Sequence, residues 1–369
     1  MSKLWILLSV SLVLAFIIES RDKALLYKTG KKEKLYTLIL ILILAIYCGL
    51  RTWYNDTGTY LMIYNQTPLL PDFFTSDSAS LAGGWGFGLL NSIIKTLGFS
   101  SQDYLMLYAF LTVTPYVLFV RKYCPHFTFG VFLMFATGFY TFTFAAIKQC
   151  MATGICLCAV SAAIDRKWIR YLLLTVLACL FHPYAVVYFL VPFLFFRPWT
   201  GKTFVCIIGA IVVGFSLESL LGTVLEVTDM IGANYDETSF VGEGVNIFRV
   251  LVAFVPLALS LLYSRGMFAD TTRTENLMFN LAMMNALVMF IALFGTANYF
   301  ARLANYFLPA QVVVLPWMLN KITKQDRSFW KLACVAGYTG YFYYGHAIQH
   351  VFNTSFSQTN LITYISSHF

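Results

Sequence analysis

Charged residues are scarce in this chain. Only 11% of its 369 residues are Asp, Glu, Lys or Arg, whereas 59% are hydrophobic. A water-soluble domain of this length does not need so apolar a composition, and intrinsic disorder requires the opposite balance of low hydrophobicity and high charge. The composition therefore predicts a protein that lies largely within a membrane.

Cysteine and the common cofactor motifs are also sparse or missing. Eight cysteines in 369 residues are too few for a disulfide-built secreted domain. Five of them lie inside apolar runs without the spacing of a metal site, where free cysteine behaves as a small hydrophobe: Cys48, Cys150, Cys156, Cys158 and Cys179. A Walker loop, a GxGxxG, an HExxH and an EF-hand loop are absent. We therefore expect no cofactor and no metal.

Long apolar runs dominate what remains. Twelve of them approach the length of about 20 helical residues that crosses a hydrocarbon core of about 30 Å. They cover residues 4–18, 35–50, 103–120, 127–141, 142–164, 168–181, 183–196, 203–220, 246–263, 275–294, 303–320 and 329–345. The first run is not a cleaved signal peptide, because one Lys precedes it, six basic residues follow it and no small-residue cleavage site is present. The sequence predicts an all-α polytopic membrane protein with about 12 membrane-embedded helices, forming a single integral domain over residues 1–369.

The distribution of charge predicts the topology. Lys and Arg accumulate in cytoplasmic loops, and the six basic residues of 21–34 place the N-terminus outside. If the chain crosses the membrane twelve times, the C-terminus also lies outside. On this topology, 19 of the 25 basic residues but only 7 of the 17 acidic ones fall on the inner side. Topology thus accounts for the net charge of +8, and no nucleic-acid partner is needed.

Two segments depart from a simple serpentine. Residues 168–196 contain two short apolar runs joined at Phe181-His182-Pro183, which predicts a hairpin of short helices whose apex borders a cavity that opens outward. Residues 85–99 predict an amphipathic helix on the outer leaflet, with one apolar and one polar face. The apolar face carries Trp85, Leu89, Ile93 and Leu97, and the polar face carries Asn91, Ser92 and Lys95. The largest extramembrane segments, 51–102 and 221–245, are both expected outside and are expected to line the working surface.

Four basic residues lie at or inside the outer ends of helices: Arg51, Lys148, Arg249 and Arg302. A Lys or Arg deep in a span costs about 2.5–3.5 kcal/mol on insertion scales. Each could reach the headgroups or pair with an acid such as Asp56 or Glu218. For all four together we favour a cluster of cations in an outward cavity, suited to an anionic, lipid-linked ligand such as a phosphate.

Aromatic and amide side chains surround these cations. The first outer loop continues from Arg51 to Asp56, Tyr60 and Tyr64, and the last contains Asn298, Tyr299, Arg302, Asn305 and Tyr306. Aromatic rings beside amides and a carboxylate suit sugar rings, although Tyr and Trp gather at every membrane interface. For Asp56, the commoner role is that of a loop-capping residue.

These residues resemble the EpsG-like branch of the Wzy-type polysaccharide polymerases. The similarity is carried by Gly49-Leu50-Arg51 with Asp56-Thr57 and Tyr60, by Gly86–Gly98 with its final Leu-Gly pair, by Ile147–Ala152, by Leu177–His182, and by Arg302 with Tyr306. The family usually shows Arg-Gln where this chain has Lys148-Gln149, and often an acidic residue near Gly83-Gly84. The first difference keeps the charge but loses the guanidinium fork.

The resemblance implies a metal-independent membrane glycosyltransferase with a GT-C-like fold, in the bacterial plasma membrane. Its substrates would be polyprenyl-pyrophosphate-linked oligosaccharides, as donor and acceptor, and a chain-length regulator and a flippase would be its partners. We expect Arg51, Lys148, Arg249 and Arg302 to bind the pyrophosphate. Asp56 or His182 would act as the base, and Tyr60, Gln149, Tyr299 and Tyr306 would contact sugars. For His182, a helix-cap or kink role before Pro183 is nearly as well supported.

Other activities fit part of this pattern. A lipid-linked-oligosaccharide flippase would also place cations in a cavity, but it favours sites near the membrane midplane and an internal repeat, neither of which is evident here. A transferase that uses a polyprenyl-phosphate sugar, or a glycan ligase, would use the same residues.

Overall fold

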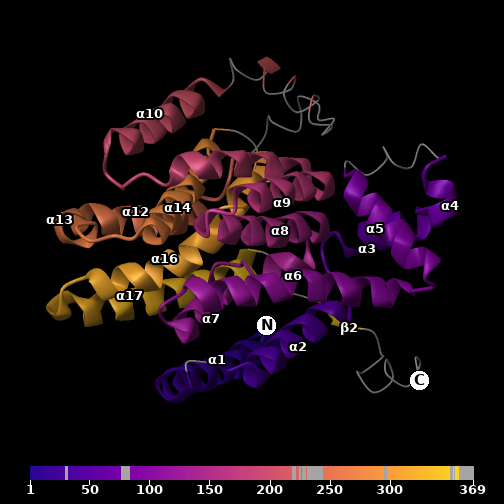
Figure 1. Cartoon of the computed structure of the whole chain (residues 1–369), viewed down its shortest axis with the longest axis horizontal. Coiled ribbons are helices and arrows are strands. Elements are labelled where there is room, and N and C mark those ends of the chain that lie inside the picture. Colours follow the sequence, from indigo (N-terminus) through magenta and orange to yellow (C-terminus); the bar gives the residue numbers. More distant parts are fainter. Residues whose placement is uncertain are drawn as a thin grey trace.

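The computed structural model describes residues 1–29, 32–75, 84–217, 222–223, 226, 230, 244–294, 297–349, 352 and 354–356. Its described part is almost entirely helical (Figure 1). The longer helices are α1 (Ser2–Thr29), α2 (Leu35–Gly49), α6 (Ser101–Tyr123), α8 (Ile147–Ile164), α9 (Trp168–Phe181), α10 (Gly201–Phe215), α12 (Ile247–Leu262), α14 (Arg273–Ile291), α16 (Leu308–Lys321) and α17 (Lys324–Tyr343). Shorter helices include α3 (Thr57–Gln66), α4 (Leu70–Phe73), α5 (Trp85–Thr96), α7 (Phe127–Ala136), α13 (Ser264–Met267) and α15 (Arg302–Asn305).

The apolar helices make this a multi-pass membrane protein. Within the described residues, four helices are long and apolar enough to cross a bilayer: Ser2–Leu26, Ser101–Tyr123, Ile147–Ile164 and Arg273–Ile291. Shorter apolar helices occupy most of the other predicted runs. The expected boundary between the runs 127–141 and 142–164 differs, because α7 ends at Ala136 and α8 begins only at Ile147, with the 3-10 turn η2 (Thr141–Phe144) between them. The all-α architecture is confirmed, whereas the number of spans stays a prediction.

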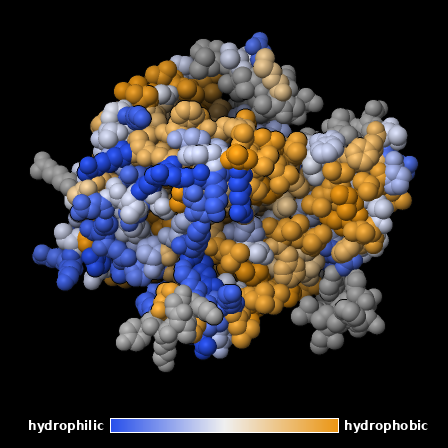
Figure 2. All heavy atoms as spheres, in the orientation of Figure 1, coloured by the Kyte–Doolittle hydropathy of each residue, from blue (hydrophilic) through white to orange (hydrophobic). Residues whose placement is uncertain are grey.

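The charged loops gather at one end of the bundle, which we call the basic end. Arg121, at the end of α6, pairs with Asp22 at 2.8 Å, and Lys122 lies 4.0 Å from Asp165 at the turn after α8. His126 bridges Glu19 of α1 and Asn320 of α16. Hydrophilic side chains cover the corresponding left-hand part of the molecule, where α13 and the start of α17 lie (Figures 1 and 2). The segments predicted to share the inner side of the membrane therefore do lie together.

The predicted hairpin at 168–196 is present, but its two arms differ. The first arm is α9, and the second is a 3-10 helix, η3 (Pro183–Leu194). They meet at His182, whose backbone is extended (φ −151°, ψ 118°). Pro183 is the first residue of this arm, where a helix tolerates proline, whereas Pro192 lies inside the arm and lacks the N–H that an α-helix would use there.

The amphipathic helix α5 turns its polar face toward the protein. The Asn91 side chain accepts a hydrogen bond from the Tyr108 hydroxyl at 2.8 Å, and Ser92 donates to the Pro68 carbonyl. Trp85 and Leu97, on the apolar face, are exposed. A polar face that packs inward and an apolar face that points outward suit a helix surrounded by lipid rather than water.

A small sheet was not predicted. Strand β1 (Arg51–Trp53) pairs antiparallel with β2 (Ser355–Phe356) and so joins the first large loop to the end of the described chain. Phe352 packs on Tyr54 and Phe144 beside it. Together with α3, α4 and α5, this sheet lies at the end of the bundle opposite the basic end, which we call the site end (Figure 1). Most of the predicted loop 221–245 lies outside the described residues.

Candidate active site

Asp56 lies immediately before α3 at the site end. It is the N-cap residue of that helix, yet its side chain makes no capping hydrogen bond. The carboxylate is instead 38% exposed and lies 4.0 Å from Arg302, measured from Oδ2 to Nη2. The common capping role therefore does not account for this residue, and its carboxylate faces a cation.

Arg302 is held by two buried amides. It follows the π-helix η5 (Ala297–Ala301) and begins the short helix α15. The Gln149 side chain of α8 donates to the backbone carbonyl of Arg302, and the Asn285 side chain of α14 donates to that of Ala304 at 2.7 Å. These bonds satisfy carbonyls of an irregular segment at a helix end and fix the direction of the Arg302 side chain. The Gln149 Oε1 atom is buried without a partner among the described residues, which leaves it able to accept from a ligand.

Lys148 lies in the first turn of α8. Its ammonium stands 5.6 Å from the centre of the Phe87 ring, and it has no ion pair or hydrogen bond within the described part of the chain. A half-buried cation without a counter-ion is costly, so a site of this kind is expected to receive an anion.

His182, at the apex of the α9–η3 hairpin, lies among these groups. It interacts electrostatically with both Lys148 and Arg302. Its Nδ1 lies 3.0 Å from the Tyr306 hydroxyl, and Tyr306 is fixed in turn because its backbone carbonyl accepts a 2.7 Å bond from Tyr188. His182 thus occupies the kink and also takes part in a polar network.

Tyr60 completes the group. Its hydroxyl hydrogen-bonds the backbone amide of Lys148 and lies within electrostatic range of Asp56 and Arg302. Burial, and the nearby charge of Asp56, raise the pKa of Tyr60 well above its ordinary value. The phenol is therefore protonated at neutral pH and can donate. We call Asp56, Arg302, Lys148, His182 and Tyr60 the Asp56 site.

The backbone at the start of α5 touches the hairpin apex. A Cβ atom on Gly84 would lie 2.5 Å from the Phe181 carbonyl oxygen. Only glycine permits this approach, which brings α5 and its Phe87 ring against the segment that carries His182. A side chain larger than that of glycine has no room at Gly84.

Arg51 has a different environment from Arg302 and Lys148. It is 1% exposed, and its guanidinium donates to the Cys48 carbonyl at 2.7 Å and to the Thr57 hydroxyl at 3.2 Å. Thr57 in turn donates to the Tyr54 carbonyl. These bonds connect the end of α2 to the start of α3 and so hold the turn that carries Asp56.

Arg249 is not among the cations that act on His182, which are Lys148 and Arg302. It is in the first turn of α12, where it interacts with the Tyr341 hydroxyl of α17. Tyr299 packs on Tyr184, whose ring lies 4.9 Å from that of Tyr299 and 4.8 Å from the imidazole of His182. The structure therefore buries Arg51 and places Arg249 beside Tyr341. It brings together Asp56, Lys148, Arg302, His182, Tyr60, Gln149 and Tyr306.

Several residues that support the Asp56 site could not be predicted from the sequence. Phe87, Tyr184, Tyr188 and Asn285 support the site, but each reads as an ordinary apolar or interface residue in the sequence. The one available signal was that Tyr184 and Tyr188 follow His182 closely along the chain. Among the described residues, no three His, Cys, Asp or Glu side chains form a group that could hold a metal ion.

One comparison with known proteins identifies a family. The EpsG family matches residues 34–366, which include every residue of the Asp56 site. Neither the curated proteins nor the solved structures gave a match. Because the family match covers most of the chain, the protein belongs to the EpsG family.

Proposed function

We propose that this protein polymerises polyprenyl-pyrophosphate-linked oligosaccharide units into an exopolysaccharide or capsular polysaccharide at the outer face of the bacterial plasma membrane. Membership of the EpsG family suggests a polysaccharide polymerase role. In this proposal the site end faces outward, both termini lie outside, and a chain-length regulator and a flippase act beside the enzyme.

The observation that carries the proposal is the charge balance of the Asp56 site. Lys148 and Arg302 both lie near His182, and among the described residues the carboxylate that pairs with either cation is that of Asp56, 4.0 Å from Arg302. One partly exposed carboxylate does not neutralise two cations. The surplus positive charge suits a pyrophosphate, and Arg302 can bind phosphate oxygens through two N–H groups.

The transfer needs little else from the protein. The acceptor hydroxyl oxygen forms a bond to the anomeric carbon of the donor sugar, while the bond from that carbon to the pyrophosphate oxygen breaks. The hydroxyl proton passes to Asp56, and polyprenyl pyrophosphate leaves with its negative charge held by Lys148 and Arg302. We assign the base role to Asp56 because it is an anion, whereas His182 would become a third cation on taking the proton.

The remaining residues position the substrates. Tyr60 donates from its protonated hydroxyl, the unpaired oxygen of Gln149 accepts from a sugar hydroxyl, and Tyr299 presents aromatic surface. Tyr306 is fully buried and acts through its contact with His182. Arg51 acts through the turn that it holds, rather than by touching the pyrophosphate.

A reconstitution experiment tests this function. Purified protein in nanodiscs receives lipid-linked repeat units without nucleotide, with chelator in one arm and a divalent metal in another, and the products are separated by size. A ladder of multiples in the chelated arm supports a metal-independent polymerase. A ladder that requires the divalent ion would replace the proposed cation mechanism. A companion assay in proteoliposomes, in which single units move across the bilayer without growth, would indicate a flippase. One transfer to a different acceptor would indicate a ligase or a single-sugar transferase.

A further inference from the structure

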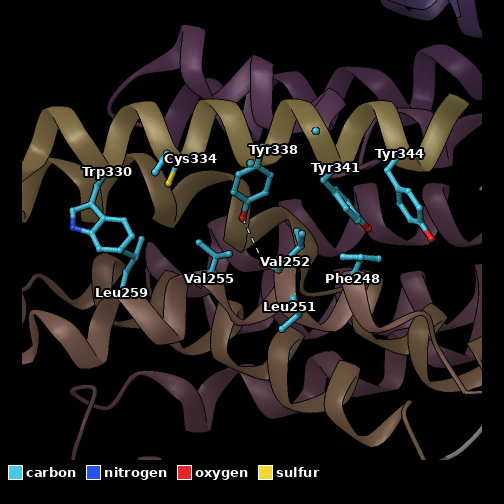
Figure 3. Close-up of a pocket in the computed structure, with 13 residues that line it drawn as sticks. Phe248, Leu251, Val252, Val255, Leu259, Trp330, Cys334, Tyr338, Tyr341 and Tyr344 are labelled. Carbon is cyan, nitrogen blue, oxygen red and sulfur yellow. Dashed lines mark hydrogen bonds between the residues drawn. The ribbon is translucent and has the colours of Figure 1, made fainter. Parts of the chain in front are cut away.

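A long apolar groove lies between α12 and α17 (Figure 3). The two helices run antiparallel, with Phe248 opposite Tyr344 and Leu259 opposite Trp330. Both pack on α16, whose buried Gln311 donates to the Val252 carbonyl and to the Tyr338 hydroxyl, so α16 forms the floor. The cavity measures about 470 Å³. From Phe248 to Leu259 it extends about 16 Å, at 1.5 Å per helical residue.

The two ends of the groove differ. At the basic end it is closed by Trp330, which donates to the Tyr263 hydroxyl, and Tyr263 donates to Asp326. At the site end lie Tyr341 and Arg249. No carboxylate in the described ranges pairs with Arg249. The groove is therefore apolar along its length and positively charged at one end.

The side of the groove that faces away from α16 is open. Gly337 and Gly340 line it, and a Cβ atom on either would meet no atom within 4 Å. Phe248 and Leu251 are about half exposed along the opposite wall. The apolar runs 246–263 and 329–345 predict that both helices lie in the membrane, and on that prediction a molecule that fills this groove enters from lipid.

We propose that the α12–α17 groove binds the isoprenoid chain of one of the two lipid-linked saccharides, with its phosphate at Arg249. This inference rests on the proposed function, which requires two lipid-linked substrates at once. Arg249 acts on Tyr341, whereas Lys148 and Arg302 act on His182, so a phosphate held at Arg249 leaves the Asp56 site free for the other lipid. The shape and charge match such a lipid: one linear apolar chain follows the groove, and an anionic group lies at its cationic end.

Photolabelling tests the groove directly. The full-length protein in phosphatidylglycerol nanodiscs is exposed to a polyprenyl pyrophosphate that carries a diazirine in its chain, and the labelled peptides are mapped by mass spectrometry. We compare wild type with Gly337→Leu and Gly340→Leu, which fill the groove without a clash. The matched control is Gly209→Leu, since Gly209 lies in the apolar helix α10 with equally open surroundings. Melting temperatures confirm that the variants fold.

We expect labelling of residues 247–262 and 324–343 in wild type and in Gly209→Leu, and a fall of about tenfold in the groove variants, because a few displaced methylene contacts suffice for that. Arg249→Gln should weaken labelling by the pyrophosphate lipid but not by an uncharged polyprenol probe. Excess phosphatidylglycerol and excess unlabelled polyprenyl pyrophosphate are compared as competitors of the probe. If both remove the label equally well, the groove holds ordinary bilayer lipid and the inference is overturned. Unchanged labelling in both groove variants would also overturn it.

A failure of the lipid-chain site can be distinguished from a failure of the proposed polymerase function. A labelled groove in a protein that forms no polymer would refute the polymerase assignment and leave the lipid-chain site standing. If Gly340→Leu forms polymer at the wild-type rate and with the wild-type KM, the lipid-chain site is refuted. The polymerase assignment would then still stand.

Discussion

The guanidinium of Arg302 and the carboxylate of Asp56 face each other at 4.0 Å, from loops near opposite ends of the sequence. Both side chains are more than a third exposed, so the pair adds little to stability and is screened by solvent. A weak, open pair of this kind can separate to admit a ligand between its members. This relationship underlies the first prediction.

Asp56→Asn should abolish most of the transfer activity while the protein stays folded. The amide keeps the size of the side chain but cannot take the acceptor proton, which should lower kcat by about 10²–10⁴. Asp72→Asn is the control, because Asp72 is an exposed acid of the same outer segment, in α4. Size-resolved product formation checks both variants. Comparable activity in Asp56→Asn and wild type would rule out Asp56 as the base.

Lys148→Met should separate stability from activity. The ammonium has no counter-ion within the described structure, so its removal should leave the melting temperature unchanged or raise it, while transfer falls about 10²–10³-fold. Lys95→Met should show the opposite pattern, since Lys95 donates to the Asn65 and Thr67 carbonyls and its loss leaves them unpaired. A lower melting temperature for Lys148→Met would show that the ammonium has a structural partner.

Arg51→Lys distinguishes a structural arginine from a pyrophosphate ligand. Lysine cannot reproduce the bonds to Cys48 and Thr57, so we expect a loss of about 1–3 kcal/mol in the free energy of unfolding. Thr57→Val should change stability in the same direction but by less. Thermal unfolding and substrate titration check this. An unchanged melting temperature with a raised KM would instead support direct pyrophosphate binding.

Tyr306→Phe tests the contact with His182. Loss of the hydroxyl should lower kcat about tenfold, because His182 loses the group that orients its ring, and should cost about 1 kcal/mol of stability. Tyr140→Phe is the matched control: Tyr140 is equally buried and donates one bond, to the Leu44 carbonyl, outside the Asp56 site. Equal activity losses in the two variants would mean that Tyr306 acts only by packing.

The loop before α2 should make stability depend on pH. The hydrogen bond from Arg21 lowers the pKa of Glu33, and the backbone amides of Tyr36 and Leu35 lower it further. A carboxyl group whose pKa is lower in the folded than in the unfolded protein contributes its full stabilisation above the unfolded pKa of about 4.3. This contribution to the free energy of unfolding disappears as the pH falls through the folded pKa. Between pH 7 and pH 3.5, the melting temperature should therefore fall more steeply for wild type than for Glu33→Gln or Arg21→Gln. Parallel curves would contradict the assignment.

Much of the fold could be predicted because its signals are local. The apolar runs, the break at His182-Pro183 and the two faces of residues 85–99 depend on residues close in sequence. The second arm of the hairpin was harder, since the sequence does not distinguish an α-helix from the 3-10 helix that the structure shows. The β1–β2 pairing could not be predicted, because it joins residues 51–53 to 355–356 and depends on long-range packing.

The sequence by itself determined the class of protein, the end of the bundle at which its charged loops gather and the four unusual cations, because hydrophobicity and charge act residue by residue. Only the tertiary structure decided how those cations are used. It buried Arg51 among backbone carbonyls, brought Lys148 and Arg302 to His182 and Asp56, and left Arg249 at the end of the α12–α17 groove. The reason is physical: the role of a charge depends on which groups surround it, and those groups come from helices distant in the chain.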